Sequence, residues 1–516
     1  MRKQKECYMK TPVKKKKKGE IRAGLTALWT VLLLVSFLLF FAAKWYRDTY
    51  GNLGFDSILY TLLSDLGGVE TELVEDFCVN ALLPAVLGTV VSCVAAFSEP
   101  KKKGKLYPLS NAVASLLCLI LLAGLLAGAT VTSGLHLYVY DLFHESAIFE
   151  EAYVDPNSVE IKFPEKKRNL IYIFLESMET SYFSQEQGGA LEVNLIPELY
   201  ALAEENVNFS QHEDVGGFRP VSGTTWTIGA MVGQTAGVPL KTPDNVKDWQ
   251  NGYGEEGVFL PGITNLGDIL QENGYYQSLM VGSVCSFGGR KVYYQTHGTD
   301  TIYELRTARA DGIVPGDYFV WWGIEDKYLF QYAKQELAEI ADQEQPFAFS
   351  LLTVDTHHIG GYVCEYCGSE REEQYENVIS CSSKQVLEFV EWIQAQAFYE
   401  NTTIVIVGDH PSMDNGYFSR NVPETHTRRI YNCIINPATE PAQAKNREFT
   451  TLDMFPTTLG AMGCEIQGNR LGLGTNLFSS RKTLAEEMGF SRFDSQLSQK
   501  STYYAEKFRQ EVSTTE

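Results

Sequence analysis

The sequence predicts N-terminal membrane helices followed by an α/β domain with a central, mostly parallel sheet between helices. Two observations lead to this prediction. Three uncharged apolar stretches lie within the first 131 residues, and each is about 20 residues or longer, enough to cross a hydrocarbon core of about 30 Å. Further along the chain, short apolar runs alternate with helical patterns and end directly in polar residues. Such runs are typical of strands that are buried on both faces of a parallel sheet.

The apolar stretches are predicted to be transmembrane helices at Ala23–Ala43, Phe77–Phe97 and from Tyr107 to about Val131. The first is too long for the apolar core of a cleavable signal peptide, and lysine and aromatic residues follow it. Basic residues precede the first stretch and fill segment 101–105, whereas the segment between the first two stretches is acidic. The positive-inside rule therefore predicts a cytoplasmic N-terminus and an extracellular or periplasmic location after residue 132.

The predicted organisation has five parts: a basic cytoplasmic N-terminus (1–22), a membrane domain (23–131), a juxtamembrane connector (132–168), an outer folded domain (169–480) and a polar C-terminal tail (481–516). The formal net charge of −21 understates the acidity of the outer part, because many lysines lie in the cytoplasmic segments. This acidity argues against a nucleic acid as partner. For Cys364, Cys367 and Cys381 a disulfide is the first interpretation; a structural zinc site without an obvious fourth ligand, or free thiols, are the alternatives.

Two predicted strands end in residues suited to bind a metal. The strand Thr402–Val407 is followed by a glycine and then by Asp409 and His410, and the strand Asn169–Leu175 ends at Glu176. Ligands of open α/β sheets bind beyond the carboxyl ends of the strands. Carboxylate oxygens and imidazole nitrogens at that edge suit a divalent metal, although a lone Glu176 is also typical of a helix cap or a surface charge.

A glycine-, serine- and threonine-rich loop within Gly216–Leu240 runs into a predicted helix that begins at Thr227. A hydroxyl at a helix N-terminus meets free N–H groups and the positive end of the helix dipole. That environment suits a nucleophile that attacks a phosphoryl group, and N-capping is the simpler alternative. The remaining predicted elements are strands at Gln277–Gly282, Phe347–Val354 and Ile430–Ile435 and helices at Pro197–Asn206, Trp321–Ile340 and Ser383–Gln396.

At these residues the chain resembles the lipoteichoic acid synthase and phosphoglycerol transferase family, whose members are membrane proteins of the alkaline phosphatase/sulfatase superfamily. The segments that carry the resemblance are 170–177, 223–232, 352–358 and 407–410. The third segment and Trp226–Ile228 are most similar to phosphoglycerol transferase I, the branch that decorates periplasmic glucans. The resemblance extends to the architecture and implies a sulfatase-like outer domain behind the membrane helices.

The resemblance also implies roles for individual residues. Glu176, Thr227, Asp409 and His410 would hold one divalent metal ion, with Mn²⁺ the first expectation and Mg²⁺ or Zn²⁺ the alternatives. Thr227 would also be the nucleophile, with Thr225 and Thr224 as alternatives. Arg290, His357 and His358 would contact the substrate, and His357 would add acid/base catalysis. Gly288 stands where related synthases have a tryptophan, so the pocket is expected to differ. The Cys/Ser-x-Pro-x-Arg signature of sulfatases is absent, which argues against sulfate hydrolysis.

The implied activity is transfer of glycerol phosphate from phosphatidylglycerol, through a phospho-threonine, to a glycan, glycolipid or polyglycerol-phosphate acceptor outside the cell membrane. Two alternatives remain open. A phosphoethanolamine transferase would share the same metal and threonine core. A catalytically inactive sensor would bind lipid head groups without turning them over.

Overall fold

The computed structural model describes residues 12–51, 54–63, 71–98, 109–242 and 257–509. The chain divides into two compact units: Met1–Asn52 with Val69–Leu137, and Leu53–Gly68 with Tyr138–Glu516. The basic residues before residue 12 and the lysine-rich segment 101–105, on which the predicted orientation depends, lie outside the described residues.

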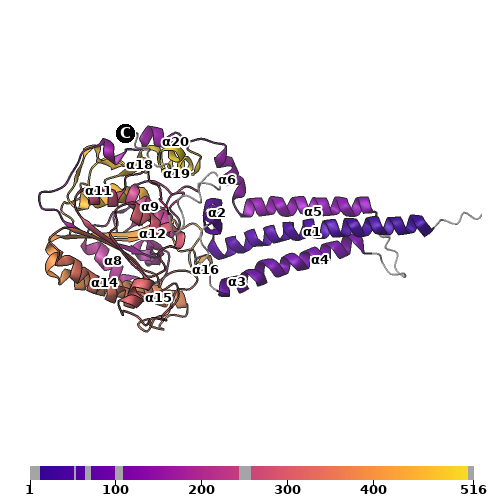
Figure 1. Cartoon of the computed structure of the whole chain (residues 1–516), viewed down its shortest axis with the longest axis horizontal. Coiled ribbons are helices and arrows are strands. Elements are labelled where there is room, and N and C mark those ends of the chain that lie inside the picture. The colour runs from indigo at the N-terminus through magenta and orange to yellow at the C-terminus, as the bar shows by residue number, and fades with distance from the viewer. Residues whose placement is uncertain (1–11, 52–53, 64–70, 99–108, 243–256, 510–516) are drawn as a thin grey trace, which may run out of the picture. The chain divides into compact units, whose positions relative to one another are not determined.

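The first unit contains the predicted transmembrane helices. Helices α1 (Pro12–Tyr50) and α5 (Asn111–Thr132) are continuous, whereas α3 (Thr71–Phe77), the π-helical turn η1 (Cys78–Leu82) and α4 (Leu83–Phe97) follow one another directly (Figure 1). Three helical stretches are long and apolar enough to cross a membrane: Glu20–Tyr50, Val74–Phe97 and Asn111–Thr132. The prediction of three such helices is therefore confirmed.

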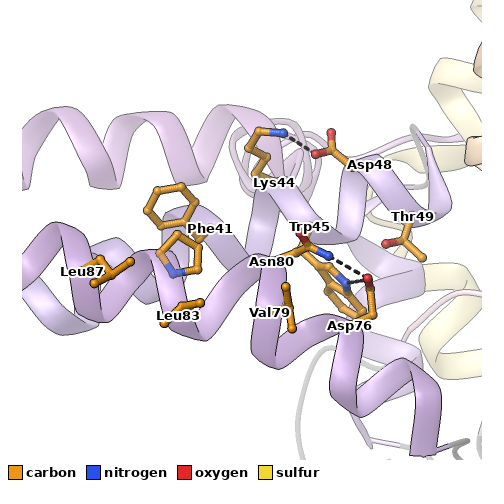
Figure 2. A pocket seen from close by; sticks show the side chains of 11 residues that line it. Phe41, Lys44, Trp45, Asp48, Thr49, Asp76, Val79, Asn80, Leu83 and Leu87 are labelled. Carbon is orange, nitrogen blue, oxygen red and sulfur yellow. Dashed lines mark hydrogen bonds and ion pairs between the residues drawn. The ribbon is translucent and has the colours of Figure 1, made fainter.

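A cavity of about 580 Å³ lies between α1, α3, η1 and α4 of this unit (Figure 2). Five of its polar or partly polar side chains pair with one another. Lys44 forms an ion pair with Asp48, and the Trp45 Nε1–H and Asn80 Nδ2–H groups each donate to a different oxygen of Asp76 at 2.6 Å. The apolar part of the lining is formed by Phe41, Val79, Leu83, Pro84 and Leu87. All the lining residues belong to the first unit.

The second unit is built on a seven-stranded sheet with the order β3-β8-β7-β2-β6-β4-β5. The strands β2 (Asn169–Leu175), β4 (Tyr276–Val281), β5 (Thr301–Tyr303), β6 (Phe347–Leu352) and β7 (Thr402–Gly408) are parallel. Strand β8 (Ile430–Ile435) is antiparallel to both β7 and the short β3 (Gly217–Phe218). The mostly parallel sheet predicted from the apolar runs is confirmed.

Alternate residues of each central strand face two separate cores. Leu170, Tyr172 and Phe174 of β2 pack with α9 (Thr227–Ala236), α11 (Leu266–Glu272), α12 (Arg290–Thr296) and α17 (Met454–Ala461). Ile171 and Ile173 pack with α8 (Pro197–Glu205), α14 (Asp326–Ala341) and α15 (Gln374–Gln394). The helices α8, α14 and α15 therefore cover one face of the sheet and α9, α11 and α12 the other (Figure 1). This sandwich explains why the strands are apolar throughout.

The largest differences from the sequence prediction are at the starts of two helices and in the C-terminal segment. Helix α14 begins at Asp326 rather than at Trp321, which has a positive φ of 55° that a helix does not accommodate. Helix α15 begins at Gln374 rather than Ser383, because Tyr375 and Val378 continue its buried stripe. The expected polar tail forms α18 (Leu484–Met488), α19 (Phe490–Ser498) and α20 (Thr502–Lys507), which contribute Phe493, Leu497, Tyr504 and Phe508 to the first core.

The expected connector also contributes to that core, through Ile148 and Phe149 of α7 (Ile148–Ala152). The other elements are short: α2 (Phe55–Leu63), α6 (Leu135–Leu142), α13 (Leu305–Ala310), α16 (Asn415–Asn421), the antiparallel pair β1 (Ile161–Lys162) and β9 (Glu465–Ile466), and the antiparallel pair β10 (Arg470–Leu471) and β11 (Gly474–Thr475).

Candidate active site

Strands β6, β2 and β7 lie side by side, and their carboxyl ends meet at one edge of the sheet. Leu175 pairs with Gly408, so that Glu176 and Asp409 leave the sheet at the same level. Glu176, Asp409 and His410 are buried, and each offers one metal-ligating atom within 4.8 Å of the others. The structure thus brings together three of the four predicted metal ligands, which are far apart in the sequence.

The orientation of two of these side chains is fixed by backbone groups. Asp409 Oδ1 accepts the N–H groups of Ser177 at 2.8 Å and of His410 at 2.7 Å, whereas its buried Oδ2 has no hydrogen-bond partner among the described residues. His410 Nδ1 lies 2.9 Å from the Pro411 carbonyl, so it donates there and leaves a lone pair on Nε2. Nε2 lies 3.3 Å from Asp409 Oδ2 and 3.6 Å from Glu176 Oε1. These donor atoms fit a divalent cation.

The electrostatics of the cluster also fit a cation. Burial and the neighbouring Glu176 carboxylate raise the pKa of Asp409 to about 7. Burial acts to raise the pKa of Glu176 as well, but the nearby His410 and His357 outweigh burial and lower it. Burial acts to lower the pKa of His410, and the two carboxylates reverse that effect. Two carboxylates in a buried site are costly without a positive charge between them, which a divalent ion would supply.

Thr227 lies beside this cluster at the first position of helix α9, as the sequence predicts. Its Oγ1 is 3.2 Å from His410 Nε2. The N-cap is Trp226, whose side chain makes no capping bond, so Thr227 is not the cap of this helix. The buried Thr224 hydroxyl is bound to both the N–H and the carbonyl of Val221, at 2.9 and 2.8 Å, and serves to shape the loop.

His357 lies in the loop after β6. Its ring centre is 4.5 Å from that of Trp322 and 4.3 Å from that of His358. Nδ1 donates to the His358 carbonyl at 2.8 Å, which leaves Nε2 as an acceptor. Burial lowers the pKa of His357, and the Glu176 carboxylate opposes this effect without reversing it. Burial and the charge of His357 lower the pKa of His358 further. Both shifts favour the neutral form of the two rings.

Arg290 is buried, and backbone carbonyls hold its guanidinium group. Nη2 donates to Val284 at 2.9 Å and Nε to Phe287 at 3.1 Å. Its charge contributes to the lowered pKa of Glu176 and of His357, so the guanidinium acts electrostatically on the cluster. Arg290 is therefore not a solvated surface arginine.

Gln234, which was not predicted from the sequence, connects helix α9 to strand β7. Its Nε2 donates to the carbonyls of Gly408 at 3.0 Å and of Asp409 at 3.3 Å, and its Oε1 accepts the Tyr172 hydroxyl at 2.9 Å. The side chain is fully buried. A single amide within an otherwise apolar helix was the signal that could have identified it.

The pair Glu179 and Arg428 was also missed. Arg428 forms an ion pair with the buried Glu179 and donates to the Ser412 carbonyl at 2.7 Å, while the Ser412 N–H donates to Glu179 Oε1 at 3.0 Å. The pair thereby holds the segment after His410. No pattern marks either residue, because both lie in irregular polar segments.

The sheet is mostly parallel, buried Glu, Asp and His side chains lie at its strand ends, and a threonine at a helix N-terminus lies beside them. These features define an alkaline phosphatase-like α/β protein. The chain belongs to the Sulfatase family, whose model matches residues 168–464.

The chain is also similar to proteins named phosphoglycerol transferase I. The one from Xanthomonas campestris pv. campestris is 30% identical over 334 residues, which are 64% of this chain and 45% of the relative. The one from Salmonella choleraesuis is 27% identical over 476 residues, 89% of this chain and 58% of the relative. The chain thus spans about half the length of these relatives. The solved structure of a lipoteichoic acid synthase from Listeria monocytogenes is 18% identical, with a TM-score of 0.48 over 62% of this chain and 79% of that one. The resemblance predicted from the motifs is confirmed.

Proposed function

We propose that this chain is a membrane-bound phosphoglycerol transferase that moves glycerol phosphate from phosphatidylglycerol to a hydroxyl acceptor. The observation that supports this most is the 3.2 Å approach of the Thr227 hydroxyl to a buried Glu–Asp–His cluster. The similarity to proteins named phosphoglycerol transferase I favours this donor.

Glu176, Asp409 and His410, together with the Thr227 hydroxyl, would hold one divalent ion, with Mn²⁺ the first expectation. When bound, the ion would lower the pKa of the hydroxyl and offset negative charge on the phosphoryl group. The N-terminus of α9 adds its free N–H groups and the positive end of its dipole on the same side.

The reaction then proceeds in two displacements. Thr227 Oγ1 loses its proton and forms a bond to phosphorus while the bond from phosphorus to the diacylglycerol oxygen breaks, and that oxygen takes up a proton. In the second step an acceptor hydroxyl loses its proton and bonds to phosphorus while the bond from phosphorus to Thr227 Oγ1 breaks, and Oγ1 takes up a proton. His357, whose Nδ1 donates to a carbonyl and whose Nε2 is left as an acceptor, would carry these protons. Arg290, with His358 beside His357, would hold the phosphate and glycerol of the head group.

The membrane helices place the proposed enzyme next to its lipid donor, which raises the effective donor concentration. We propose that the second unit faces the outside of the cell, as the basic N-terminal segment predicts. The acceptor would be a glycan, a glycolipid or a growing polyglycerol-phosphate chain. Protease treatment of intact cells would test this orientation: cleavage within the second unit is expected, and complete protection would contradict it.

The function is tested by mass spectrometry of the detergent-solubilised full chain after incubation with phosphatidylglycerol and Mn²⁺. We expect a glycerol-phosphate adduct on the peptide that contains Thr227, and none in Thr227→Ala. Thr225→Ala is the matched control in the same loop and should keep the adduct. An adduct formed only with phosphatidylethanolamine would identify a phosphoethanolamine transferase instead. Binding of lipid vesicles without an adduct from either donor would identify a sensor.

A further inference from the structure

Three cysteines converge in the second unit, in a cluster with no role in the proposed reaction. Cys364 and Cys367 lie in the segment after β6, and Cys381 lies on α15. Cys364 Sγ is 3.7 Å from the Sγ atoms of both Cys367 and Cys381, and all three sulfurs are within 4.8 Å of one another. None of the three is in a disulfide.

These separations suit a shared metal ion. Thiolates bound tetrahedrally at about 2.3 Å from zinc stand about 3.8 Å apart. The two sulfurs of a disulfide are separated by only about 2.05 Å, and a disulfide would use two of the three cysteines and leave the third without a role. The two 3.7 Å separations from Cys364 match two edges of a zinc–thiolate tetrahedron, and the third pair of sulfurs lies within 4.8 Å.

Hydrogen-bond donors around the sulfurs fit the same interpretation. The buried Gln385, one helical turn after Cys381, directs Nε2 at Cys381 Sγ at 3.4 Å and at Cys364 Sγ at 3.9 Å. The backbone N–H of Cys367 donates to the Cys364 carbonyl at 3.1 Å, which closes a turn that brings these two cysteines together. Side-chain donors such as that of Gln385 stabilise thiolates and orient them as metal ligands.

The cluster also lies at a segment that has no regular secondary structure to hold it in place. Residues 353–373, between β6 and α15, form neither helix nor strand, and this segment carries His357 and His358. Irregular segments of this length within a folded domain are uncommon unless they are functional or held by other contacts. A metal bound by the cysteines would tie the segment to α15, and Glu365 already ties it to Lys327 of α14 through a 3.0 Å ion pair.

We propose that Cys364, Cys367 and Cys381 bind a structural zinc ion, with a solvent molecule as the fourth ligand. Cys367 is only partly buried, so solvent reaches the cluster. The site would fix the segment that carries His357, and it is separate from the Glu176–Asp409–His410 cluster because the two groups share no residue. The proposal does not depend on the reaction proposed above.

Cobalt substitution tests the proposal, because Co²⁺ bound to thiolates absorbs in the near ultraviolet through sulfur-to-metal charge transfer, whereas oxygen and nitrogen ligands give no such band. The full chain, purified in detergent, is depleted of metal and titrated with Co²⁺. We expect the thiolate band at one equivalent per chain in the wild type and in Asp409→Ala, and its loss in Cys381→Ser. Cys464→Ser removes another buried thiol of the same unit and is the matched control, expected to keep the band.

Alkylation of the wild-type protein tests metal binding by the three cysteines even if Cys381→Ser fails to fold. The native protein is treated with an alkylating reagent with and without a chelator, and peptides are analysed by mass spectrometry. We expect the three cysteines to be protected until the chelator is added, and to react together afterwards. Two cysteines that stay unmodified in denaturant until a reductant is added would reveal a disulfide and overturn the proposal. Reaction that is independent of the chelator, together with no thiolate band, would show free thiols and also overturn it.

Discussion

Thr227 Oγ1 and His410 Nε2 lie 3.2 Å apart although 183 residues separate them in the chain. The approach follows from the topology, because helix α9 begins where strand β7 ends. The nitrogen that faces the hydroxyl is also the one left as an acceptor by the bond from His410 Nδ1 to the Pro411 carbonyl. The proposed nucleophile and the proposed metal ligand therefore lie close enough to bind the same metal ion.

Removing the imidazole of His410 should weaken metal binding without unfolding the protein. His410→Ala deletes one ligand atom and is expected to lower Mn²⁺ affinity by about 100-fold or more, because even outer partners of a metal ligand contribute about 10- to 100-fold. Isothermal titration of metal-depleted full chain with Mn²⁺ measures this. Thr225→Ala should bind Mn²⁺ like the wild type. Unchanged affinity in His410→Ala would remove His410 from the metal site.

Gln234 should stabilise the contact between helix α9 and strand β7. Gln234→Leu fills similar space but leaves the buried Gly408 and Asp409 carbonyls without the donor, and an unsatisfied buried polar group costs about 1–3 kcal/mol. Tyr172→Phe removes only the hydroxyl that donates to Gln234, and is expected to cost about 1 kcal/mol. Denaturant unfolding of both variants measures the difference. Equal stability of Gln234→Leu and the wild type would show that the amide has no such role.

Much of this fold could be predicted because the central strands are buried on both faces. Their apolar runs are unambiguous, and the runs of β2 and β7 end just before Glu176 and Asp409, which places both carboxylates at one edge of the sheet. The direction of β8 could not be predicted, because Ile430–Ile435 reads the same whether it pairs parallel or antiparallel to β7. The burial of the C-terminal helices against the first core was not predicted, because pairs such as Phe493 and Leu497 are sparse among polar residues.

The residues of the candidate site also divide into those that the sequence predicts and those that it does not. Glu176 and the Asp409–His410 pair could be predicted because they directly follow apolar strands, and Thr227 because it begins a helix after a glycine-, serine- and threonine-rich loop. Gln234 and Arg428 were not predicted, because they act on backbone carbonyls and on another side chain. Which carbonyl or carboxylate they meet depends on tertiary packing that no local pattern records.

Stability is expected to fall as pH rises through the range in which Asp326 and Asp355 ionise. Burial raises the pKa of Asp326 to about 7, and burial with the Asp326 charge raises the pKa of Asp355 well above its usual value. An unfolded aspartate ionises near pH 3.9. Between that value and the folded pKa the folded protein holds protons that the unfolded chain has released, so raising the pH favours unfolding.

Asp355→Asn tests this assignment. In the wild type Asp355 Oδ1 accepts the Asp326 N–H at 3.1 Å, and the amide oxygen of the asparagine can still accept it. The amide nitrogen replaces Oδ2, a buried atom with no hydrogen-bond partner among the described residues. The variant should lose less stability than the wild type between pH 5 and pH 8, as measured by urea unfolding at several pH values. An unchanged slope would exclude Asp355 as a source of the pH dependence.

Arg290 should contribute to substrate binding more than to turnover. Its guanidinium group is held by the carbonyls of Val284 and Phe287 and acts electrostatically on Glu176, so its charge is fixed beside the proposed phosphate site. Arg290→Ala is expected to raise KM for phosphatidylglycerol by about 10- to 100-fold, since hydrogen bonds to charged groups contribute about 1.5–3 kcal/mol. Arg290→Lys keeps the charge without the planar fork, and its KM should lie between those of the wild type and Arg290→Ala.

Arg306→Ala removes a largely exposed arginine and should leave KM unchanged. Because Arg290 also binds its own loop, the melting temperature of each variant is measured alongside. A fall in kcat at constant KM, in a variant that melts like the wild type, would move Arg290 from binding the head group to stabilising the transition state.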